Sequence, residues 1–415
     1  MGQSVLILFA IFVPILWGIC IHAKKEFKTR RNLIAFASIG LAVTTLLSFA
    51  ILFMGDMQLY VFAVGENMHI FFHADKMGRI FMMIVTIVLP LVGIYAFEYM
   101  EHHERPNTFF MFYSMAYGVT LGIAFASDML SMYFFYELLT LSTVPLVMHT
   151  LERDAILATR KYLYYSLGGA AFALMGLVFL IVYGDTLEFT LGGVLNMAKI
   201  GDNANILMWI YLFAFLGFGV KAAIFPVCEW LPTAGVAPTP VTALLHAVAV
   251  VKAGVFAIMR VTFFSFGTTL LVNTFVQDIV LGFSCFTIVF GSAMAWREQH
   301  LKRRFAYSTI SNLSYILVGI GLMSSEGFIG AISHMLFHAV MKICLFFCVG
   351  VIMYKTHKEY VYQIEGYGTK MPITFTCFMI GACALSGIPL FAGFVSKSAL
   401  ANAAVLQSSI WSLII

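Results

Sequence analysis

Runs of 18 or more apolar residues recur from one end of this 415-residue chain to the other. Each run is long enough to cross a hydrocarbon core of about 30 Å as a helix. About twelve are present, at residues 3–22, 33–54, 78–98, 108–127, 129–149, 162–183, 206–226, 240–260, 270–296, 305–324, 328–354 and 373–412, the last of them interrupted. The chain is 61% hydrophobic and 11% charged, whereas soluble domains are about 45–50% apolar and 25% charged. This composition excludes a soluble globular enzyme and predicts an all-α polytopic membrane protein.

The first span, Val5 to Cys20, has no basic segment before it and no A-x-A cleavage site after it, so we expect a retained helix. The short alternating segments of a transmembrane barrel are missing. Seven cysteines form neither a C-x-x-C metal pattern nor a disulfide framework, which indicates packing residues. The sequence also has no Fe–S, flavin, nucleotide or haem motif. We therefore predict no metal, no cofactor and no bond-making active site in this chain.

The lysines and arginines between spans fall mostly on one side of the predicted membrane. Sixteen lie in one set of connections, namely Lys24, Lys25, Lys28, Arg30, Arg31, Arg105, Arg153, Arg160, Lys161, Arg297, Lys302, Arg303, Arg304, Lys355, Lys358 and Lys370. Four lie in the other set, namely Lys76, Arg79, Lys199 and Arg260. Because cytoplasmic loops are enriched in Lys and Arg, we expect a multi-pass protein of the cell membrane with its N-terminus outside.

No linker or soluble insertion of domain size interrupts the chain, so residues 1–415 are predicted to form a single membrane domain. The sequence stops at Ile415 inside an apolar run, with no cap and no polar tail. On this pattern we expect a truncated polypeptide.

Four lysines lie inside the predicted spans, namely Lys221, Lys252, Lys342 and Lys397, and Glu137 lies deep within another. Each costs about 2.5–3.5 kcal/mol at the centre of a lipid-facing helix, so we expect them to face the bundle interior. Intramembrane charges of this kind usually mark a proton or ion path. The alternative is that some form structural ion pairs or reach the membrane surface with their long side chains. Glu137 is the only acidic residue expected deep in the membrane, and its expected partner is one of the four lysines.

His334, His338 and Lys342 are spaced at i, i+4 and i+8, which places them on one face of a helix. We interpret this ladder as a relay of titratable groups. A structural polar cluster is the main alternative, and a metal site would need ligands that the neighbouring sequence lacks. Lys252 is predicted to be the central protonatable site, with His246 as a supporting residue that need not touch it. His69, His73, His102 and His103 are expected to be ordinary solvated or interfacial residues.

Two spans contain helix-breaking residues beside a lysine. Pro226, Pro232, Gly235, Pro238 and Pro240 follow Lys221, and Gly387, Pro389 and Gly393 precede Lys397. Interrupted segments at matching positions of two halves are typical of transporters with inverted repeats. The breaks fall in the seventh and twelfth spans, which predicts N-terminal helices at 1–107 and two inverted five-helix repeats at 108–260 and 270–415. Two independent proline kinks are the alternative.

The segment KAAIFPVCEWLPTAGVAPTPVTALLHAVAVVKAGVFAIMR, from Lys221 to Arg260, resembles the signature of the antiporter-like membrane subunits. This family is shared by respiratory complex I (NADH-quinone oxidoreductase), Mrp-type cation/proton antiporters and membrane-bound hydrogenases. FYELLTLSTVPLV, HAVMKICLFFCVG and SGIPLFAGFVSK resemble further family segments in the expected order. The resemblance implies about fourteen helices, of which about twelve are present here.

The resemblance also implies roles for single residues. Glu137 and Lys221 would form a regulatory pair, Lys252 would be the central lysine, His338 and Lys342 would bridge the two halves, and Lys397 would be the terminal site. If the Glu137 carboxylate moves away from its lysine, the lysine is left desolvated and unpaired and tends to release its proton.

Three functions remain open at this point. The first is a proton-translocating subunit of a redox-driven complex of the complex I or hydrogenase type. The second is a subunit of a Mrp-type secondary Na⁺(K⁺)/H⁺ antiporter, and the third is a non-transporting scaffold. The expected partners are other membrane subunits, soluble Fe–S, flavin or hydrogenase subunits in the redox case, and the lipid bilayer, with no nucleic acid.

Overall fold

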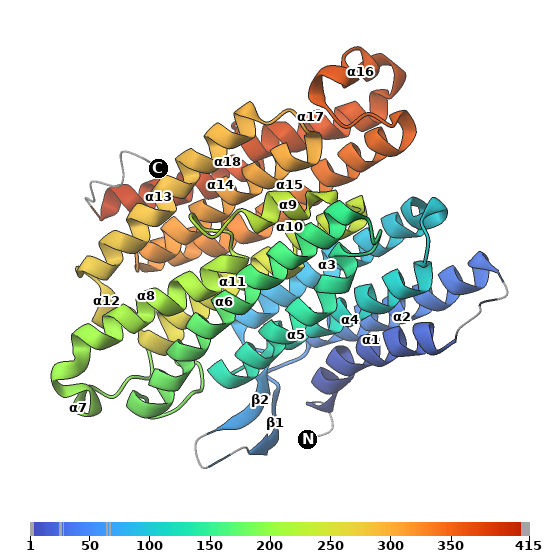
Figure 1. Ribbon diagram of the computed structural model, residues 1–415. Helices are drawn as coiled ribbons and strands as arrows, with labels where there is room; N and C mark the ends of the chain where they lie inside the picture. The colour runs from blue at the N-terminus through green and yellow to red at the C-terminus, as the bar shows by residue number, and fades with distance from the viewer. Residues whose placement is uncertain (1–3, 25–26, 28, 64, 66–67, 408–415) are drawn as a thin grey trace.

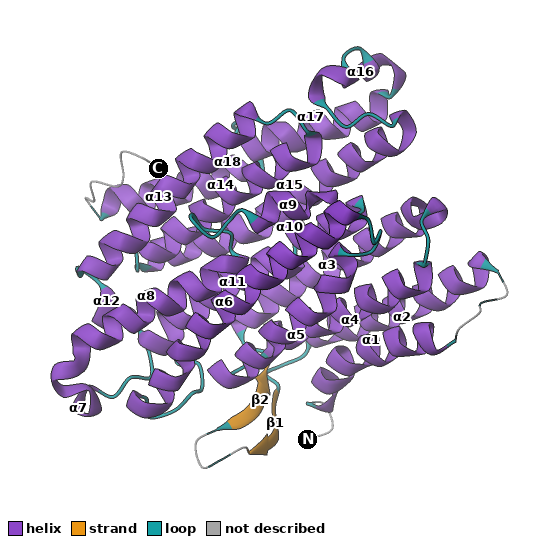
Figure 2. Cartoon of the chain, in the orientation of Figure 1, coloured by secondary structure: helices purple, strands orange, loops and turns teal. Residues whose placement is uncertain are grey.

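The computed structural model is a bundle of long helices with one small hairpin at its end (Figures 1 and 2). It describes residues 4–24, 27, 29–63, 65 and 68–407. The elements are α1 (Val5–Ala23), α2 (Arg30–Phe53), β1 (Gln58–Ala63), β2 (His69–His73), α3 (Lys76–Tyr99), α4 (Pro106–Phe125), α5 (Met129–Val147), α6 (Arg153–Tyr183), α7 (Met197–Ile200), α8 (Ala204–Lys221), α9 (Trp230–Thr233), α10 (Thr239–Ala247), α11 (Ala249–Arg260), α12 (Thr268–Leu271), α13 (Phe275–Arg297), α14 (Leu301–Gly321), α15 (Ser325–Thr356), α16 (Tyr367–Lys370), α17 (Pro372–Ser386) and α18 (Ala392–Leu406).

Ten helical spans within the described residues are long and apolar enough to cross a membrane. The other predicted spans correspond to α14, which has 21 residues, and to the shorter apolar pair α17 and α18. The prediction of an all-α polytopic membrane protein is therefore confirmed. Helix α6 begins at Arg153 rather than at the predicted residue 162, because the helix continues into a polar segment that hydropathy alone does not include.

A two-stranded antiparallel hairpin follows α2, in the connection between the second and third predicted spans. β1 pairs with β2 in a register that places Gln58 opposite His73 and Tyr60 opposite Phe71. The Tyr60 and Phe71 rings stack across the two strands with their centroids 4.0 Å apart, which stabilises the hairpin. The Ser127 N–H donates to the Phe71 carbonyl at 3.1 Å, so β2 is fixed to the junction of α4 and α5.

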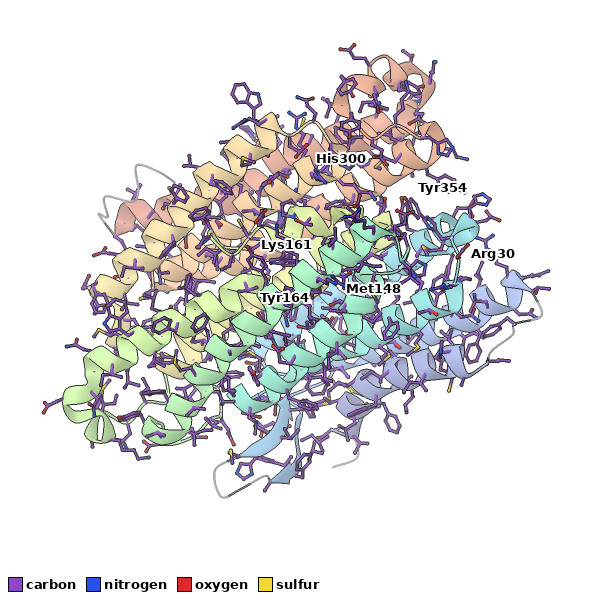
Figure 3. All side chains as sticks on the ribbon, in the orientation of Figure 1. Arg30, Met148, Lys161, Tyr164, His300 and Tyr354 are labelled. Atoms are coloured by element: carbon purple, nitrogen blue, oxygen red, sulfur yellow. The ribbon has the colours of Figure 1, made fainter. Side chains whose placement is uncertain are left out.

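The hairpin and the start of α1 lie at one end of the bundle (Figure 1). Arg30, His300 and Tyr354 are labelled toward the opposite end in Figure 3, where the turns rich in lysine and arginine connect the helices. We call this second end the basic end. The assignment of the basic end to the cytoplasm stays a prediction.

Helices α10 and α11 form the centre of the bundle, and every residue of both is buried. They pack against α3, α5, α8, α14 and α15. The chain is broken between them at Val248, whose φ of −139° and ψ of −62° lie outside the helical range. We predicted one continuous span at 240–260, and the sequence offers neither proline nor glycine at this break.

The two predicted interruptions are present. α8 ends at Lys221, and the chain returns to regular helix through turns and the short α9. Pro226 lies in these turns and Pro232 lies within α9, whereas Pro238 and Pro240 stand at the start of α10, where proline is well tolerated. α17 ends at Gly387, whose φ of +85° suits a glycine cap, and α18 begins after Pro389.

Candidate functional site

The Glu137 and Lys221 side chains meet between α5 and α8. The Lys221 ammonium lies 4.0 Å from Glu137 Oε1 and donates a hydrogen bond to the backbone carbonyl of Tyr136. It also lies 3.4 Å from the centre of the Tyr136 ring, a cation–π contact. The Lys221 side chain is 1% exposed, while that of Glu137 is 24% exposed. At 4.0 Å the ion pair is long, and the closer contacts of the Lys221 ammonium are those with Tyr136.

Lys221 is the last residue of α8, and this position has a physical reason. The final carbonyl groups of a helix lack intrahelical donors and carry partial negative charge, which favours a cation there. Gly254 of α11 packs against this end of α8, because a Cβ at Gly254 would overlap the backbone nitrogen of Ala222. A glycine at position 254 thus permits a close approach of the two helices. It brings the helix that carries Lys252 against the helix that carries Lys221.

Lys252 is fully buried and makes two hydrogen bonds. Its Nζ lies 2.8 Å from His338 Nδ1 on α15 and donates to the backbone carbonyl of His246 at 3.1 Å. We expected no necessary contact between Lys252 and His246, since six residues of regular helix separate their faces by about 120°. The break at Val248 explains the difference: it places the His246 carbonyl in the last turn of α10, where the carbonyls lack helical donors.

The ladder on α15 is buried and polar at three levels. His334, His338 and Lys342 are all 0% exposed. The His334 and His338 rings stack with centroids 5.9 Å apart, and His334 Nδ1 lies 2.9 Å from the Ser396 hydroxyl of α18. Lys342 turns to α14, where it donates to the Phe305 carbonyl at 2.9 Å and to the Ser308 hydroxyl. The two histidines thus link α11 to α18, and Lys342 forms a side branch to α14.

Lys397 lies one residue beyond Ser396 and is half-buried. Its ammonium donates to the Leu385 carbonyl at 2.9 Å, in the last turn of α17, and lies 5.1 Å from the centre of the Tyr315 ring. This position beside the end of a broken helix parallels that of Lys221.

The predicted residues therefore form two groups with direct contacts: Glu137 with Lys221, and Lys252 with His338, His334 and, through Ser396, the start of α18. Lys342 and Lys397 adjoin the second group through different neighbours. His246 lies beside the Phe346 ring, at 5.0 Å between centroids, and neither ring nitrogen has a hydrogen-bond partner among the described residues. Sequence reasoning missed Tyr136, Ser308, Tyr315 and Ser396, because isolated hydroxyl groups in apolar helices carry no spacing signal.

The other histidines lie away from this interior network. His73 binds Asp56 at 2.6 Å on the hairpin, where both side chains are accessible. His102 and His103 line a cavity of about 360 Å³ at the basic end, together with His357. Within the described residues no group of three or more His, Cys, Asp or Glu side chains is arranged to hold a metal ion.

A second buried ion pair joins α3 to α11 near the hairpin end. The Arg260 guanidinium is 1% exposed and binds both carboxylate oxygens of Asp75, at 2.6 and 2.7 Å. Burial alone would raise the pKa of Asp75, but the charge and hydrogen bonds of Arg260 and the N–H of Gly78 hold it below its ordinary value. The pair is thus charged at neutral pH and fixes the start of α3.

Asp128 caps α5 at the same end. Its carboxylate accepts from the Ser131 N–H at 2.7 Å, the Ser131 hydroxyl at 2.5 Å and the Phe71 N–H of the hairpin at 3.3 Å. Burial raises the pKa of Asp128 to about 6, although these hydrogen bonds oppose the shift. One carboxylate therefore connects the hairpin to the start of the helix that carries Glu137.

The fold and the buried network define a class of polytopic membrane protein in which lysine, glutamate and histidine side chains meet in the interior of the bundle. The family described as "NADH:quinone oxidoreductase/Mrp antiporter, TM" matches residues 126–415, and the model described as "NADH-Ubiquinone oxidoreductase (complex I), chain 5 N-terminus" matches residues 62–110. The first match covers more than half of the chain. This chain belongs to the NADH:quinone oxidoreductase/Mrp antiporter transmembrane family, as its sequence predicted.

Relatives and solved structures agree with this assignment. A Na(+)/H(+) antiporter subunit from Alkalihalophilus pseudofirmus is 30% identical over 355 residues, covering 81% of this chain and 43% of the relative. A Na(+)/H(+) antiporter subunit from Staphylococcus aureus is 30% identical over 339 residues, covering 78% and 41%. The chain thus spans less than half the length of these curated relatives.

Two solved assemblies contain chains of the same fold. A chain of the archaeal membrane-bound sulfane sulfur reductase, a respiratory membrane complex, gives a TM-score of 0.85 at 24% identity, covering 98% of this chain and 83% of that one. A chain of the Mrp complex from Dietzia sp. gives a TM-score of 0.87 at 21% identity, covering 100% and 77%.

Proposed function

We propose that this chain translocates protons across the membrane as an antiporter-like subunit of a larger membrane complex. The observation that carries the proposal is the series of buried contacts from Lys252 through His338 and His334 to Ser396. Polar side chains in a hydrocarbon environment are costly, so a chain of them that crosses several helices indicates a path for ions or protons.

The hydrogen bond between Lys252 and His338 is suited to proton transfer. A charged lysine has three donors and no acceptor, so His338 Nδ1 must accept while Lys252 is protonated. A neutral Lys252 can accept instead from a protonated His338 Nδ1. The bond at 2.8 Å therefore has two states that differ by the position of one proton. The Nε2 atoms of His334 and His338 have no partner among the described residues, which leaves the outer nitrogen of each ring available for the next transfer.

Glu137 and Lys221 act as the controlling pair in this proposal. When the carboxylate is near, it favours the charged lysine; when it withdraws, the buried ammonium is unpaired and releases its proton toward Lys252. The packing of Gly254 against the end of α8 supports the coupling, because a shift at Lys221 moves the helix that carries Lys252. Internal water completes the path where no direct contact joins two groups, as between Lys221 and Lys252 and between His334 and Lys397.

The positions of the two interruptions support the proposed inverted repeats, at residues 108–260 and 270–415. Lys221 is the last residue of α8, and Lys397 donates to a carbonyl in the last turn of α17, so each repeat has a lysine beside the end of a broken helix. We further propose that the N-terminus faces outside in the cell membrane, with the basic end in the cytoplasm.

Two settings fit this activity. In a redox-driven complex, electron transfer in Fe–S, flavin or hydrogenase partners would supply the energy, and the respiratory complex that contains the archaeal neighbour supports this setting. In a Mrp-type antiporter, Na⁺ or K⁺ exchange would use the proton gradient, and the two antiporter relatives at 30% identity support this second candidate.

The first experiment replaces single lysines in the complex purified with its partners and measures proton uptake in proteoliposomes. We expect K221M and K252M to abolish uptake while leaving the complex assembled. The matched control is K161M, which removes a lysine paired at 2.7 Å with the exposed Glu229 at the surface. Full uptake in both K221M and K252M would contradict the proposal and favour the scaffold function.

A second experiment distinguishes the two settings. The tagged chain is purified in mild detergent and its partners are identified by mass spectrometry. Fe–S, flavin or nickel–iron subunits indicate a redox-driven pump, and only small hydrophobic antiporter-type subunits indicate a cation/proton exchanger.

A further inference from the structure

A cavity of about 1000 Å³ opens at the basic end of the bundle, between the ends of four helices. Its wall includes His22 near the end of α1, Arg30 at the start of α2, Glu101 just past α3, and Arg105 and Asn107 at the start of α4. Arg30 is labelled in Figure 3 and marks the position of this cavity on the basic end. No residue of the proposed proton path lines it, so its role is independent of that path.

The mouth of the cavity carries excess positive charge. Arg30 is already neutralised by Glu101 at 2.5 Å and also donates to the Phe97 carbonyl at 2.6 Å. Arg105 also lines the cavity, and no ion pair or hydrogen bond engages its side chain in the described part of the chain. Among the lining residues that the structure describes, two guanidinium groups thus face one carboxylate. The start of α4 has no side-chain cap, so the positive end of its helix dipole lies at the same place.

The floor of the cavity is apolar. Leu33 and Ile34 of α2, Phe97 of α3 and Phe110 of α4 line it. A second, narrow cavity of about 20 Å³ lies between the same helices and shares Phe97 and Phe110, with Gly93 among its other lining residues. The lining therefore changes from cationic to apolar along the direction of the helix axes.

We propose that this cavity binds an anionic phospholipid, with its phosphate at Arg105 and Arg30 and one acyl chain along the apolar floor. The helices end at this level, which is where lipid headgroups meet a membrane-spanning bundle. The planar guanidinium fork matches the oxygens of a phosphodiester. A free phosphate would gain nothing from the apolar floor. A zwitterionic lipid has the same phosphate, but the cation of its headgroup would be repelled by the excess of guanidinium groups. Basic pockets between transmembrane helices are suited to anionic headgroups for this reason.

The test compares Arg105→Gln with Arg31→Gln in the purified protein. Arg31 is the exposed neighbour of Arg30 and does not line the cavity, so both variants lose one positive charge at the same end. The delipidated protein is titrated with phosphatidylglycerol or phosphatidylcholine, and bound lipid is counted by native mass spectrometry. We expect wild-type protein to prefer phosphatidylglycerol, R105Q to bind it about fivefold more weakly, and R31Q to match wild type.

A second variant tests the floor without a change of charge. Ile34→Trp fills the apolar part of the cavity and is expected to weaken phosphatidylglycerol binding too, and it carries the test if R105Q does not fold. Inorganic phosphate added at millimolar concentration should not displace the lipid. The proposal is overturned if R105Q and R31Q weaken binding equally, if the two lipids bind alike, or if phosphate competes with the lipid.

Discussion

The buried ion pair between Asp75 and Arg260 allows a quantitative test of what holds the hairpin end of the bundle together. Asp75→Asn keeps the size of the side chain and the oxygen that caps the Gly78 N–H, but it removes the negative charge. The Arg260 guanidinium would then remain among the rings of Phe189 and Phe256 without a carboxylate. Because Arg260 is 1% exposed, water cannot replace the lost partner without a local opening of the structure.

Removing one partner of a buried pair costs about 3–5 kcal/mol, and we expect D75N to lower the free energy of unfolding by this amount at pH 7. Asp75→Ala should cost about 1 kcal/mol more, because the helix cap is lost as well. The folded-state pKa of Asp75 is below its ordinary value of 3.8, so the charged carboxylate makes its full contribution to the free energy of unfolding above pH 3.8. It is lost as the pH falls through the lowered folded-state pKa, and D75N should approach wild type there.

The assay is unfolding by sodium dodecyl sulfate in mixed micelles, followed by far-UV circular dichroism. The control is Asp185→Asn, which removes a carboxylate paired with Lys199 at 3.2 Å in an exposed loop. We expect D185N to unfold at the same detergent fraction as wild type, because exposed ion pairs contribute little. Equal midpoints for D75N and D185N would refute the reasoning.

Three further outcomes are expected. Gly254→Ala should destabilise the protein by about 1–3 kcal/mol and reduce proton uptake, because the new Cβ overlaps the backbone just beyond α8. Gly168→Ala, at a position with open space around it, should change neither the stability nor the uptake. Ser396→Ala removes the only hydrogen-bond partner of His334 among the described residues, so it should slow proton uptake severalfold and lower the free energy of unfolding by about 1 kcal/mol. Normal uptake would count against His334 as a relay. Because the folded-state pKa of Asp128 is raised to about 6, ionisation of Asp128 should lower the melting temperature of the wild-type protein as the pH rises from about 4 to about 6. Asp128→Asn should lack this decrease, and identical pH profiles of the two proteins would contradict the assignment.

The hydrophobic runs were sufficient to predict the helices because a membrane span must be long and apolar whatever its neighbours are. The pairing of Glu137 with a lysine followed from the same physics, since an unpaired carboxylate deep in the membrane is costly. The glycines and prolines beside Lys221 and Lys397 gave the two interruptions. In each of these cases the physical properties of a residue type restrict it to one kind of position in a membrane protein.

The remaining features depend on tertiary contacts that leave no local pattern. The break at Val248 has no proline or glycine, and it is stabilised by a lysine side chain that bonds the His246 carbonyl from beyond the break. Ser308 and Ser396 matter because their hydroxyl groups contact Lys342 and His334 of α15. The sequence of an apolar helix does not indicate whether a serine in it faces lipid or a histidine. The hairpin lies in a connection that hydropathy treats as a loop.

The complete burial of α10 and α11 has a consequence for how this protein is made. These two segments enter the membrane carrying Lys252 and Arg260, each of which costs about 2.5–3.5 kcal/mol next to lipid. The partner of Arg260 lies on a segment that is synthesised earlier, whereas the partner of Lys252 on α15 is synthesised later. The ion pair with Asp75 is thus available to hold the central span against the earlier helices before α15 has been synthesised. Until α15 is synthesised, Lys252 can bond only the His246 carbonyl of its own span. The order of synthesis therefore allows the Asp75–Arg260 ion pair to form before the hydrogen bond between Lys252 and His338.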